Sequence, residues 1–352
     1  MTELVITKSP VSKIVSRTML TVPQYASDVI DELSGVLAVC GHEAGQYSVL
    51  GPDPWRVVWN AERSGFVSFL EGRRALLMWR SPVARAHDQS ELLTRVNEYA
   101  ESVDKPLFAI EVNDAAREAG VALGMTSIWI GTESFLDLAS WSIAGGRRQK
   151  VRWARNHALK MGLSWREAFP LGRADDHDSL RHVENLWRDE RTERTTDSFL
   201  RTDFLELASL RRYFACEGPS GVIAFVSCTP VSSEGWYLQD IVREPDAPRG
   251  ALEGAMALAL DTFRDEGFTF VSNGQLPFWR PHEFWSDPDQ LGAIGNRVLK
   301  FFDRQYRFHG INQFRSKFEP DRLSPFYVLR TRRLVTPGVA RSLTKMLNTR
   351  LR

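Results

Sequence analysis

The stretch that most constrains the fold is residues 236–271, which read in order as a strand, a turn, a helix and a second strand. Its first part, WYLQDIV, alternates and is rich in aromatic and branched side chains, as half-buried strands are. From residue 251 apolar side chains recur at helical spacing, and Gly267 favours the end of that helix. Residues 268–271 return to a strand. The stretch therefore predicts a β-α-β unit, which places the chain in the α/β class.

The joint between this strand and its helix carries polar groups. Arg249 and Gly250 stand where the backbone N–H groups of a helix start can bind an anion. A buried carboxylate is costly unless it is paired, so Asp240 either forms a structural ion pair or holds a substrate ammonium group. Strict alternation places Asp240 and Arg243 on opposite faces, so their joint action requires a bulge or the strand end between them.

Composition excludes several classes of protein. Forty-five basic and 44 acidic residues nearly cancel, so nucleic-acid binding has to come from local patches. The three cysteines show no CxxC spacing and the seven histidines no HExxH pair, so we expect neither disulfides nor a metal. No uncharged apolar run reaches the ~20 residues of a membrane span. We therefore expect a reduced, cytoplasmic protein, soluble or peripheral to the membrane.

The order of elements predicts two halves with a similar plan. The first half reads as a helix, a three-stranded meander and then alternating helices and strands, at residues 25–41, 55–60, 65–71, 75–80, 90–102, 107–112, 114–120 and 127–130. The second half adds helices at residues 179–189, 203–214 and 293–305 and strands at residues 221–228 and 326–329. This order is similar to that of acetyltransferase (GNAT) domains and predicts two of them in tandem, with mixed sheets flanked by helices. The expected domains are residues 1–142, residues 143–334 and a basic amphipathic tail at residues 335–352.

The turn RGALEGA, residues 249–255, is similar to the pyrophosphate loop of acetyl-CoA-dependent N-acetyltransferases. It contains fewer glycines than that loop, and larger residues restrict the approach of a backbone to a pyrophosphate. The turn therefore supports the fold more than it supports coenzyme A, and we expect no cofactor.

A glycine-bounded basic helix, residues 145–162, connects the two halves and contains no acidic residue. Arg148, Arg152 and Arg155 share one of its faces. The apolar residues on another side form a stripe that we expect to be buried: Val151, Ala154, Ala158 and Met161. Clustered arginines can bind the phosphate backbone of a nucleic acid, although a solvated basic face shows the same pattern.

A second cluster, residues 306–320, interleaves aromatic with basic side chains. Tyr306 and Phe308 beside Arg315 and Lys317 suit the stacking of an unpaired base and the binding of its phosphate. The alternative for the aromatic residues is a place in the core.

Two other segments have open interpretations. The proline-broken loop at residues 276–289 places Trp279 beside His282, where they line an acceptor pocket or cap the core. His282 is the one histidine that we consider as a base. The tail at residues 339–352 has apolar side chains on one face and basic side chains on the other. A helix of this kind can bind an anionic membrane, bind RNA or pack on its own domain.

Together these segments resemble the C-terminal domain of the phosphatidylglycerol lysyltransferases (multiple peptide resistance factors), which related stand-alone aminoacyl-tRNA-dependent transferases share. The resemblance runs from about residue 47 to residue 330. It is most specific in the basic helix and in three motifs: ESFLDL at residues 133–138, QDIVREPDAPRGALEG at residues 239–254 and YRFHGINQFRSKFEP at residues 306–320. It implies tandem acetyltransferase-like domains that move an amino acid from aminoacyl-tRNA to a hydroxyl group.

The resemblance also implies site residues. Asp240 and Arg243 match the aspartate and arginine of the family's substrate site, and Lys317 matches the lysine of its last motif. Arg152 and Asn156 fall on the basic helix where the family has the same residue types. By these matches Asp240 would hold the α-ammonium group, and Arg243 and Lys317 would meet the terminal phosphate or the developing oxyanion. The arginines of the basic helix, Arg148, Arg152 and Arg155, would guide the acceptor stem of the tRNA.

The acceptor is less determined, because Asn312 and Arg315 stand where the family has arginine and lysine. The membrane-spanning half that is usual in the family is missing from this sequence, so we favour a small soluble acceptor with a hydroxyl group. A hydroxylamine in natural-product biosynthesis, as in related seryl transferases, is one such acceptor. The alternatives are transfer to phosphatidylglycerol at the membrane surface, an acetyl-CoA-dependent acyltransferase, and a non-catalytic RNA-binding module. The amino acid and the oligomeric state stay open.

Overall fold

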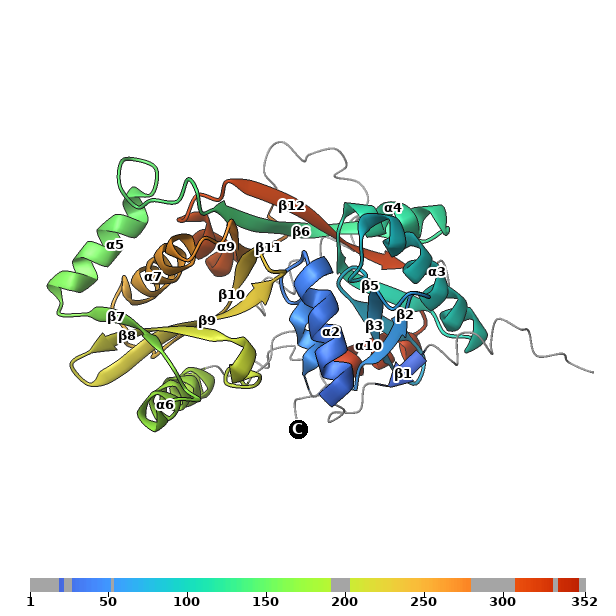
Figure 1. Ribbon diagram of the computed structural model, residues 1–352, viewed down its shortest axis with the longest axis horizontal. Helices are drawn as coiled ribbons and strands as arrows, with labels where there is room; N and C mark the ends of the chain where they lie inside the picture. Colours follow the sequence, from blue (N-terminus) through green and yellow to red (C-terminus); the bar gives the residue numbers. More distant parts are fainter. Residues whose placement is uncertain are drawn as a thin grey trace, which may run out of the picture. The chain divides into compact units, whose positions relative to one another are not determined.

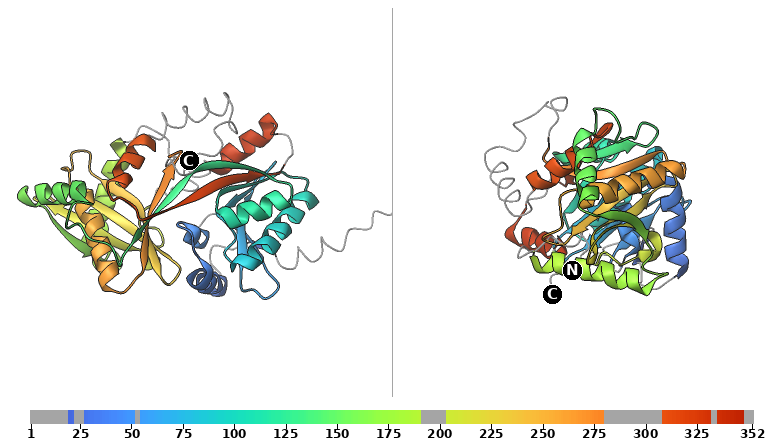
Figure 2. Two further views of the ribbon diagram at one scale, coloured as in Figure 1. Left: turned by 90° about the horizontal axis from the view of Figure 1, so that it is seen from above. Right: turned by 90° about the vertical axis from the view of Figure 1, so that its left-hand side faces the viewer.

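A computed structural model describes residues 19–21, 27–51, 54–190, 203–279, 308–331 and 335–347 of the chain. The chain forms two compact units (Figures 1 and 2). Unit 1 consists of Met1–Gly41, Pro52–Trp129 and Tyr327–Thr349, and unit 2 of His42–Gly51, Ile130–Phe326 and Arg350–Arg352. The units therefore interleave along the chain, whereas the expected domains are continuous segments whose boundaries stay a prediction.

Unit 1 is built on a mixed sheet with the strand order β1, β2, β3, β4, β5, β12. The strands are β1 (Met19–Thr21), β2 (Arg56–Trp59), β3 (Phe66–Glu71), β4 (Leu76–Trp79), β5 (Leu107–Val112) and β12 (Arg322–Arg330). β2 to β4 pair antiparallel as the predicted meander requires. β1, which was not predicted, runs antiparallel to β2, β5 runs parallel to β4, and β12 runs antiparallel to β5. The helices of the unit are α2 (Ser27–Cys40), α3 (Ala86–Ser102), α4 (Asp114–Ala122) and α10 (Pro337–Leu347).

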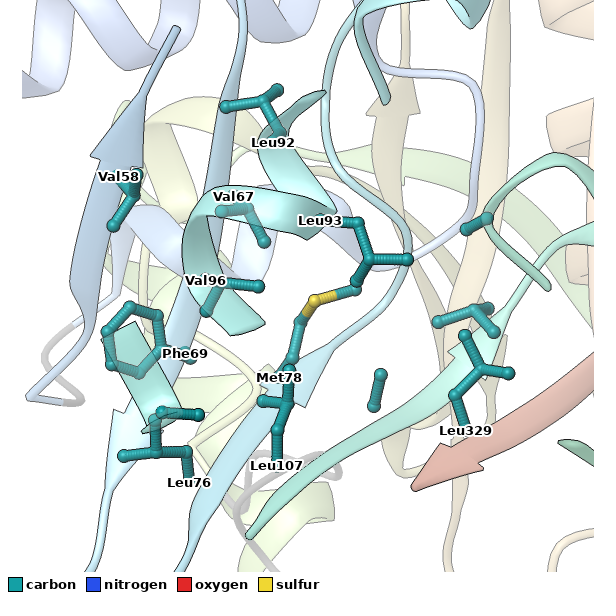
Figure 3. Close-up of a cluster of buried hydrophobic side chains, with 14 of the residues drawn as sticks. Val58, Val67, Phe69, Leu76, Met78, Leu92, Leu93, Val96, Leu107 and Leu329 are labelled. Carbon is teal, nitrogen blue, oxygen red and sulfur yellow. The ribbon is translucent and has the colours of Figure 1, made fainter. Parts of the chain in front are cut away.

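The core of unit 1 lies between α3 and this sheet, as Figure 3 shows. Leu92, Leu93 and Val96 recur at helical spacing on one face of α3, and none of the three side chains is exposed. Leu329 of β12 joins the same cluster and is also fully buried. β12, the last strand in the described residues, thus completes a core that the first third of the sequence begins.

Unit 2 is built on the other strands of the same twelve-stranded sheet, in the order β6, β11, β10, β9, β8, β7. The strands are β6 (Thr126–Asp137), β7 (Ser164–Ala168), β8 (Arg212–Gly218), β9 (Gly221–Val231), β10 (Gly235–Arg243) and β11 (Phe270–Pro277). The helices are α5 (Gln149–Lys160), α6 (Ala174–Glu190), α7 (Ala251–Asp265) and α9 (Phe308–Ser316), with short 3-10 turns η1 (Gln46–Leu50) and η2 (Ala208–Leu210).

Helices cover both faces of the sheet in unit 2. Tyr213 and Phe225 pack in one buried cluster with residues of α6, while Phe214 and Val226 pack in another with residues of α7. Because successive side chains of a strand point to opposite faces, α6 and α7 lie on opposite sides of the sheet. The fold class, α/β with acetyltransferase-like units and mixed sheets flanked by helices, is confirmed.

Two details of the prediction are wrong. Residues 203–214 do not form a helix, because Leu207 adopts a left-handed conformation and Arg212 begins β8, which pairs with β9. Met161 is 49% exposed and does not extend the buried stripe of the basic helix. The helix predicted at residues 293–305 lies outside the described residues.

Candidate functional site

The strands of the β-α-β unit separate beyond a short parallel ladder. β10 and β11 pair only from Gly235 opposite Phe270 to Tyr237 opposite Ser272, although both strands continue. On their other edges β10 pairs with β9 and β11 with β6 along their whole lengths, and each of these antiparallel ladders contains a bulge, at Gln239 and at Asn273. In α/β sheets, ligands bind beyond the carboxyl ends of the parallel strands, where neighbouring strands diverge. This divergence in unit 2 is therefore the candidate site.

The start of α7 borders the site and is already occupied by a carboxylate. Glu253, which is 4% exposed, accepts a hydrogen bond from the backbone N–H of Gly250 at 3.2 Å through Oε2. Its Oε1 accepts one from Nζ of Lys317 at 2.9 Å. Glu253 thus neutralises the helix start that would otherwise attract a pyrophosphate. This arrangement gives a physical reason for the weak glycine pattern of the turn.

Gly250 has a packing role. Its φ is +103°, and a Cβ at this position would lie 2.1 Å from the carbonyl oxygen of Ala154 in α5. A side chain would therefore separate α5 from α7.

Asp240 forms a buried ion pair. It is 7% exposed, and its Oδ2 accepts hydrogen bonds from Nη1 of Arg211 at 2.6 Å and from Oγ of Ser227 at 2.5 Å. Burial raises the pKa of the neighbouring Tyr213, whose hydroxyl donates to the carbonyl oxygen of Phe204. A small hollow of about 10 Å³, with room for about one water molecule, lies beside the pair. Its lining is Tyr47, Ser48, Leu207, Leu210, Arg211, Thr229 and Gln239.

Arg243 and Asp240 are not brought together. The bulge lies at Gln239, before Asp240, so the two residues keep the alternating order of the strand. Nη1 of Arg243 donates to the carbonyl oxygens of Glu244 and Pro245 at 3.0 and 2.7 Å, which closes the turn before α7. Arg243 therefore stabilises the turn.

The arginines of the basic helix make contacts inside unit 2. Arg148 is 2% exposed; its Nε donates to the carbonyl oxygen of Phe318 at 2.8 Å and its Nη2 pairs with Asp321 at 3.1 Å. Burial lowers its pKa. Arg152 donates to the carbonyl oxygens of Ile143 and Gly145. Arg155 is half-buried, with its guanidinium 5.9 Å from the centre of the Trp165 ring.

The remaining candidates are dispersed. Asn156 is exposed on α5. Arg315 is 9% exposed, and its Nη1 donates to the carbonyl oxygen of Gln275 in β11 at 2.5 Å. Trp279 is half-buried at the end of β11, where its carbonyl oxygen accepts from the hydroxyl of Thr132. Tyr306, His282 and the side chain of Phe308 lie outside the described part of the structure.

Sequence reasoning missed three residues that border the site. Arg211 was missed because its segment was predicted to be a helix. Glu253 was missed because an acidic residue is common in the first turn of a helix and does not by itself indicate a site. Asn273 is fully buried at the bulge of β11, and its Nδ2 donates to the carbonyl oxygen of Arg315 at 3.0 Å. A polar residue inside a predicted strand was the available signal for Asn273.

No group of three or more His, Cys, Asp or Glu side chains among the described residues is arranged to hold a metal ion. None of the helices in the described ranges combines the length and the apolar character needed to cross a membrane.

The diverging parallel strands and the helices on both faces define an acyltransferase-type α/β protein. A family model described as "Phosphatidylglycerol lysyltransferase, C-terminal" matches residues 54–330. The chain belongs to this family, which confirms the resemblance seen in the sequence.

Individual relatives agree with this assignment. The phosphatidylglycerol lysyltransferase of Staphylococcus aureus (strain MRSA252) is 22% identical over 286 residues, which cover 77% of this chain and 32% of that protein. This chain therefore spans about a third of the length of the curated relatives that it matches. The C-terminal domain of a putative lysylphosphatidylglycerol synthetase from Agrobacterium fabrum superposes with a TM-score of 0.76 at 17% identity, covering 92% of this chain and 98% of that one. L-PGS from Bacillus licheniformis gives a TM-score of 0.72 at 17% identity, with 90% and 96% covered.

Proposed function

We propose that this chain transfers an aminoacyl group from aminoacyl-tRNA to a hydroxyl group of phosphatidylglycerol. The observation that carries the proposal is the family match over residues 54–330, which includes the diverging strands and every described candidate residue. The relatives are named for transfer to this lipid, and this supports phosphatidylglycerol over the small soluble or hydroxylamine acceptor favoured by the sequence analysis. The relatives described above are not named for natural-product biosynthesis.

The reaction requires little covalent chemistry from the protein. The ester between the amino acid and the tRNA is already activated, so the hydroxyl oxygen attacks its carbonyl carbon, a new ester bond forms, and the bond to the 3′ oxygen of the tRNA breaks. The proton of the attacking hydroxyl passes to that departing oxygen. The protein has to orient the two substrates and stabilise the tetrahedral oxyanion.

Among the described cations, Lys317 is the best suited to stabilise the oxyanion. Its Nζ lies beside the first turn of α7, where it donates a hydrogen bond to Glu253. The Lys317 side chain is 23% exposed, so a substrate can reach it, whereas the Glu253 side chain is only 5% exposed. Asp240 remains our candidate for the α-ammonium group; it pairs with Arg211, which lines the hollow. Arg148 is excluded from the proposal, because a tRNA phosphate would have to displace Asp321 from a buried guanidinium.

The test is to incubate the protein with individually charged, radiolabelled tRNAs and vesicles that contain phosphatidylglycerol. We expect label in the lipid fraction, and about a 10²-fold or larger loss of kcat in the Lys317→Ala variant, as for the removal of one oxyanion donor. Transfer of label to a small hydroxyl compound added in a parallel reaction, with none in the lipid, would restore the soluble acceptor. If every charged tRNA loses its amino acid only at the spontaneous rate, the proposed transfer is wrong. A non-catalytic RNA-binding module would then be favoured.

An acetyl-CoA-dependent activity is the other enzyme that the fold permits. Calorimetric titration with acetyl-CoA tests it, and we expect no heat of binding because Glu253 occupies the start of α7.

A further inference from the structure

Lys317 lies in a short segment whose backbone and side chain are both held. Its Nζ donates a hydrogen bond to Glu253, which also accepts one from the backbone N–H of Gly250 at the start of α7. A lysine side chain is a flexible stem with a point charge at its end. The place of that charge therefore depends on how firmly the backbone of residues 315–318 is fixed.

Asn273 fixes this backbone on the side before Lys317. The Asn273 side chain is fully buried at the bulge of β11, and its Nδ2 donates to the carbonyl oxygen of Arg315 at 3.0 Å. No described residue donates a hydrogen bond to its Oδ1. A buried polar atom without a partner destabilises a fold. The presence of Asn273 is therefore explained better by the carbonyl oxygen that it holds than by stability.

Arg148, the residue directly before α5, fixes the backbone on the side after Lys317. Its side chain is 2% exposed, its Nε donates to the carbonyl oxygen of Phe318 at 2.8 Å, and its Nη2 donates to Asp321 at 3.1 Å. The same guanidinium lies 4.7 Å from the centre of the Trp141 ring, which stacks on the ring of Phe318. Because a guanidinium has several donors in one plane, it can hold a carbonyl oxygen and a carboxylate at once.

We propose that Asn273 and Arg148 are positioning residues for the transfer reaction, acting through Lys317 rather than on a substrate. They hold the backbone two residues before and one residue after Lys317, while Glu253 binds its ammonium group. A charge that is in place before the oxyanion forms stabilises it without having to move, and a small displacement of such a group lowers the rate. The inference rests on the proposed function, which gives the charge of Lys317 its task.

Two substitutions remove these contacts while leaving the neighbouring groups with partners. In Arg148→Leu, Asp321 keeps an ion pair with Arg147 at 2.6 Å. In Asn273→Leu, the carbonyl oxygen of Arg315 keeps a backbone hydrogen bond of 3.1 Å. We therefore expect both variants to fold, and the midpoint of thermal unfolding checks this.

The first experiment measures transfer in a double-mutant cycle with Lys317→Ala. We expect Arg148→Leu and Asn273→Leu each to lower kcat about 10- to 100-fold and to change KM for aminoacyl-tRNA by less than about twofold. In the Lys317→Ala background the same substitutions should lower kcat by less than about twofold, because the group through which they act is absent. Arg148→Lys keeps a donor for the carbonyl oxygen of Phe318 and should recover part of kcat.

Arg166 supplies the matched control. It resembles Arg148 in binding a backbone carbonyl oxygen and a carboxylate within unit 2. The carbonyl oxygen is that of Glu167, at 3.2 Å, and the carboxylate is that of Asp176, at 2.6 Å. Neither group belongs to the segment of Lys317, so Arg166→Leu should lower stability without changing kcat.

The second experiment does not require transfer activity. Lys317 and Lys105 have side chains that are 23% and 20% exposed, and each pairs with a carboxylate, that of Glu253 or that of Glu71. A lysine that leaves its carboxylate reacts faster with the N-hydroxysuccinimide ester of acetic acid, and mass spectrometry measures the rate at each lysine. Both leucine variants should acetylate Lys317 about tenfold faster than wild type, as expected for the loss of one hydrogen bond, with Lys105 unchanged.

Three results would overturn the inference. The first is a loss of kcat in the Lys317→Ala background as large as in wild type, which would make the two residues structural. The second is an equal loss of kcat in Arg166→Leu, and the third is an unchanged rate of Lys317 acetylation in both leucine variants. If wild type transfers no aminoacyl group, the proposed function fails by itself, and the acetylation rates alone decide whether Asn273 and Arg148 hold Lys317.

Discussion

At the scale of single residues, the Asp240 and Arg211 pair can have two roles. Both side chains are more than nine-tenths buried, and the pair sits beside a solvent-open hollow. Buried pairs contribute little net stability, yet removing one partner leaves a buried charge without compensation. A substrate contact and a structural contact at Asp240 therefore predict the same loss of activity in a single variant.

A double variant separates the two roles. We expect Asp240→Asn to lower the free energy of unfolding by about 3–5 kcal/mol, because Arg211 stays buried and charged. Arg211→Leu/Asp240→Leu should recover most of that loss in urea denaturation, since well-packed apolar residues often replace a buried pair without cost. Full transfer activity in the stable double variant would remove Asp240 from the substrate site.

Glu71 in unit 1 makes stability depend on pH. Burial raises the pKa of its carboxyl, but hydrogen bonds from Lys105 and Tyr99 and the charge of Arg56 outweigh that effect, so the pKa lies below the ordinary value of 4.5. Because the folded-state pKa is depressed, the stabilisation is fully present above pH 4.5 and is lost as the pH falls through the folded-state pKa. Glu71→Gln should therefore be less stable than wild type at pH 7, with the difference shrinking below pH 4.5 in urea titrations. A constant difference across this range would show that Glu71 is not the titrating group.

At the scale of elements, periodicity identified α3, α5 and α7, because each buries one continuous stripe on its sheet or on a neighbouring helix. The segment at residues 203–214 was misread because its apolar residues fit a helix as well as a buried strand, and pairing with β9 decided the outcome. The candidate site was predictable only in part. Local sequence showed Asp240 and Lys317, but their partners Arg211 and Glu253 lie 29 and 64 residues away and depend on the tertiary fold.

A single added methyl group tests how tightly α5 packs against α7. Gly250→Ala places a Cβ against the carbonyl oxygen of Ala154 and also strains a backbone with φ of +103°. Gly267→Ala is its control, because φ there is +89° and nothing lies within 4 Å of the added Cβ. We expect about 1–2 kcal/mol of destabilisation from Gly267→Ala and about 1–3 kcal/mol more from Gly250→Ala, measured by urea denaturation. Equal losses would mean that α5 moves aside without resistance.

At the scale of the whole molecule, the two units interleave through β6 and β12. β5 pairs with β12 between residues such as Val112 and Tyr327, and Leu329 lies in the core of unit 1. Sequence patterns show that both segments are strands but carry no information about which distant strands pair. For this reason the expected domain at residues 1–142 does not contain β12, which belongs to the same compact unit.

A fragment of residues 1–142 tests the consequence. Without β12 it leaves the edge of β5 unpaired and the Leu329 position empty, and a large-to-small change at such a core position already costs about 2–5 kcal/mol. We expect no cooperative thermal unfolding from the fragment alone, and recovery when residues 308–352 are added in trans. A fragment that unfolds cooperatively by itself would confirm residues 1–142 as an independent domain.

The same strand order affects how the chain folds during synthesis. A ribosome delivers β1 to β5 early, but it releases Tyr327–Arg330 only after the strands of unit 2 have been made. During that interval the edge of β5 offers unpaired N–H and C=O groups to any neighbouring nascent chain. The strands β7 to β11 of unit 2 are all synthesised before Tyr327–Arg330. We therefore expect unit 2 to form its hydrophobic core before β12 completes the sheet of unit 1. Aggregation during expression should therefore depend on how quickly translation covers the stretch between β5 and β12.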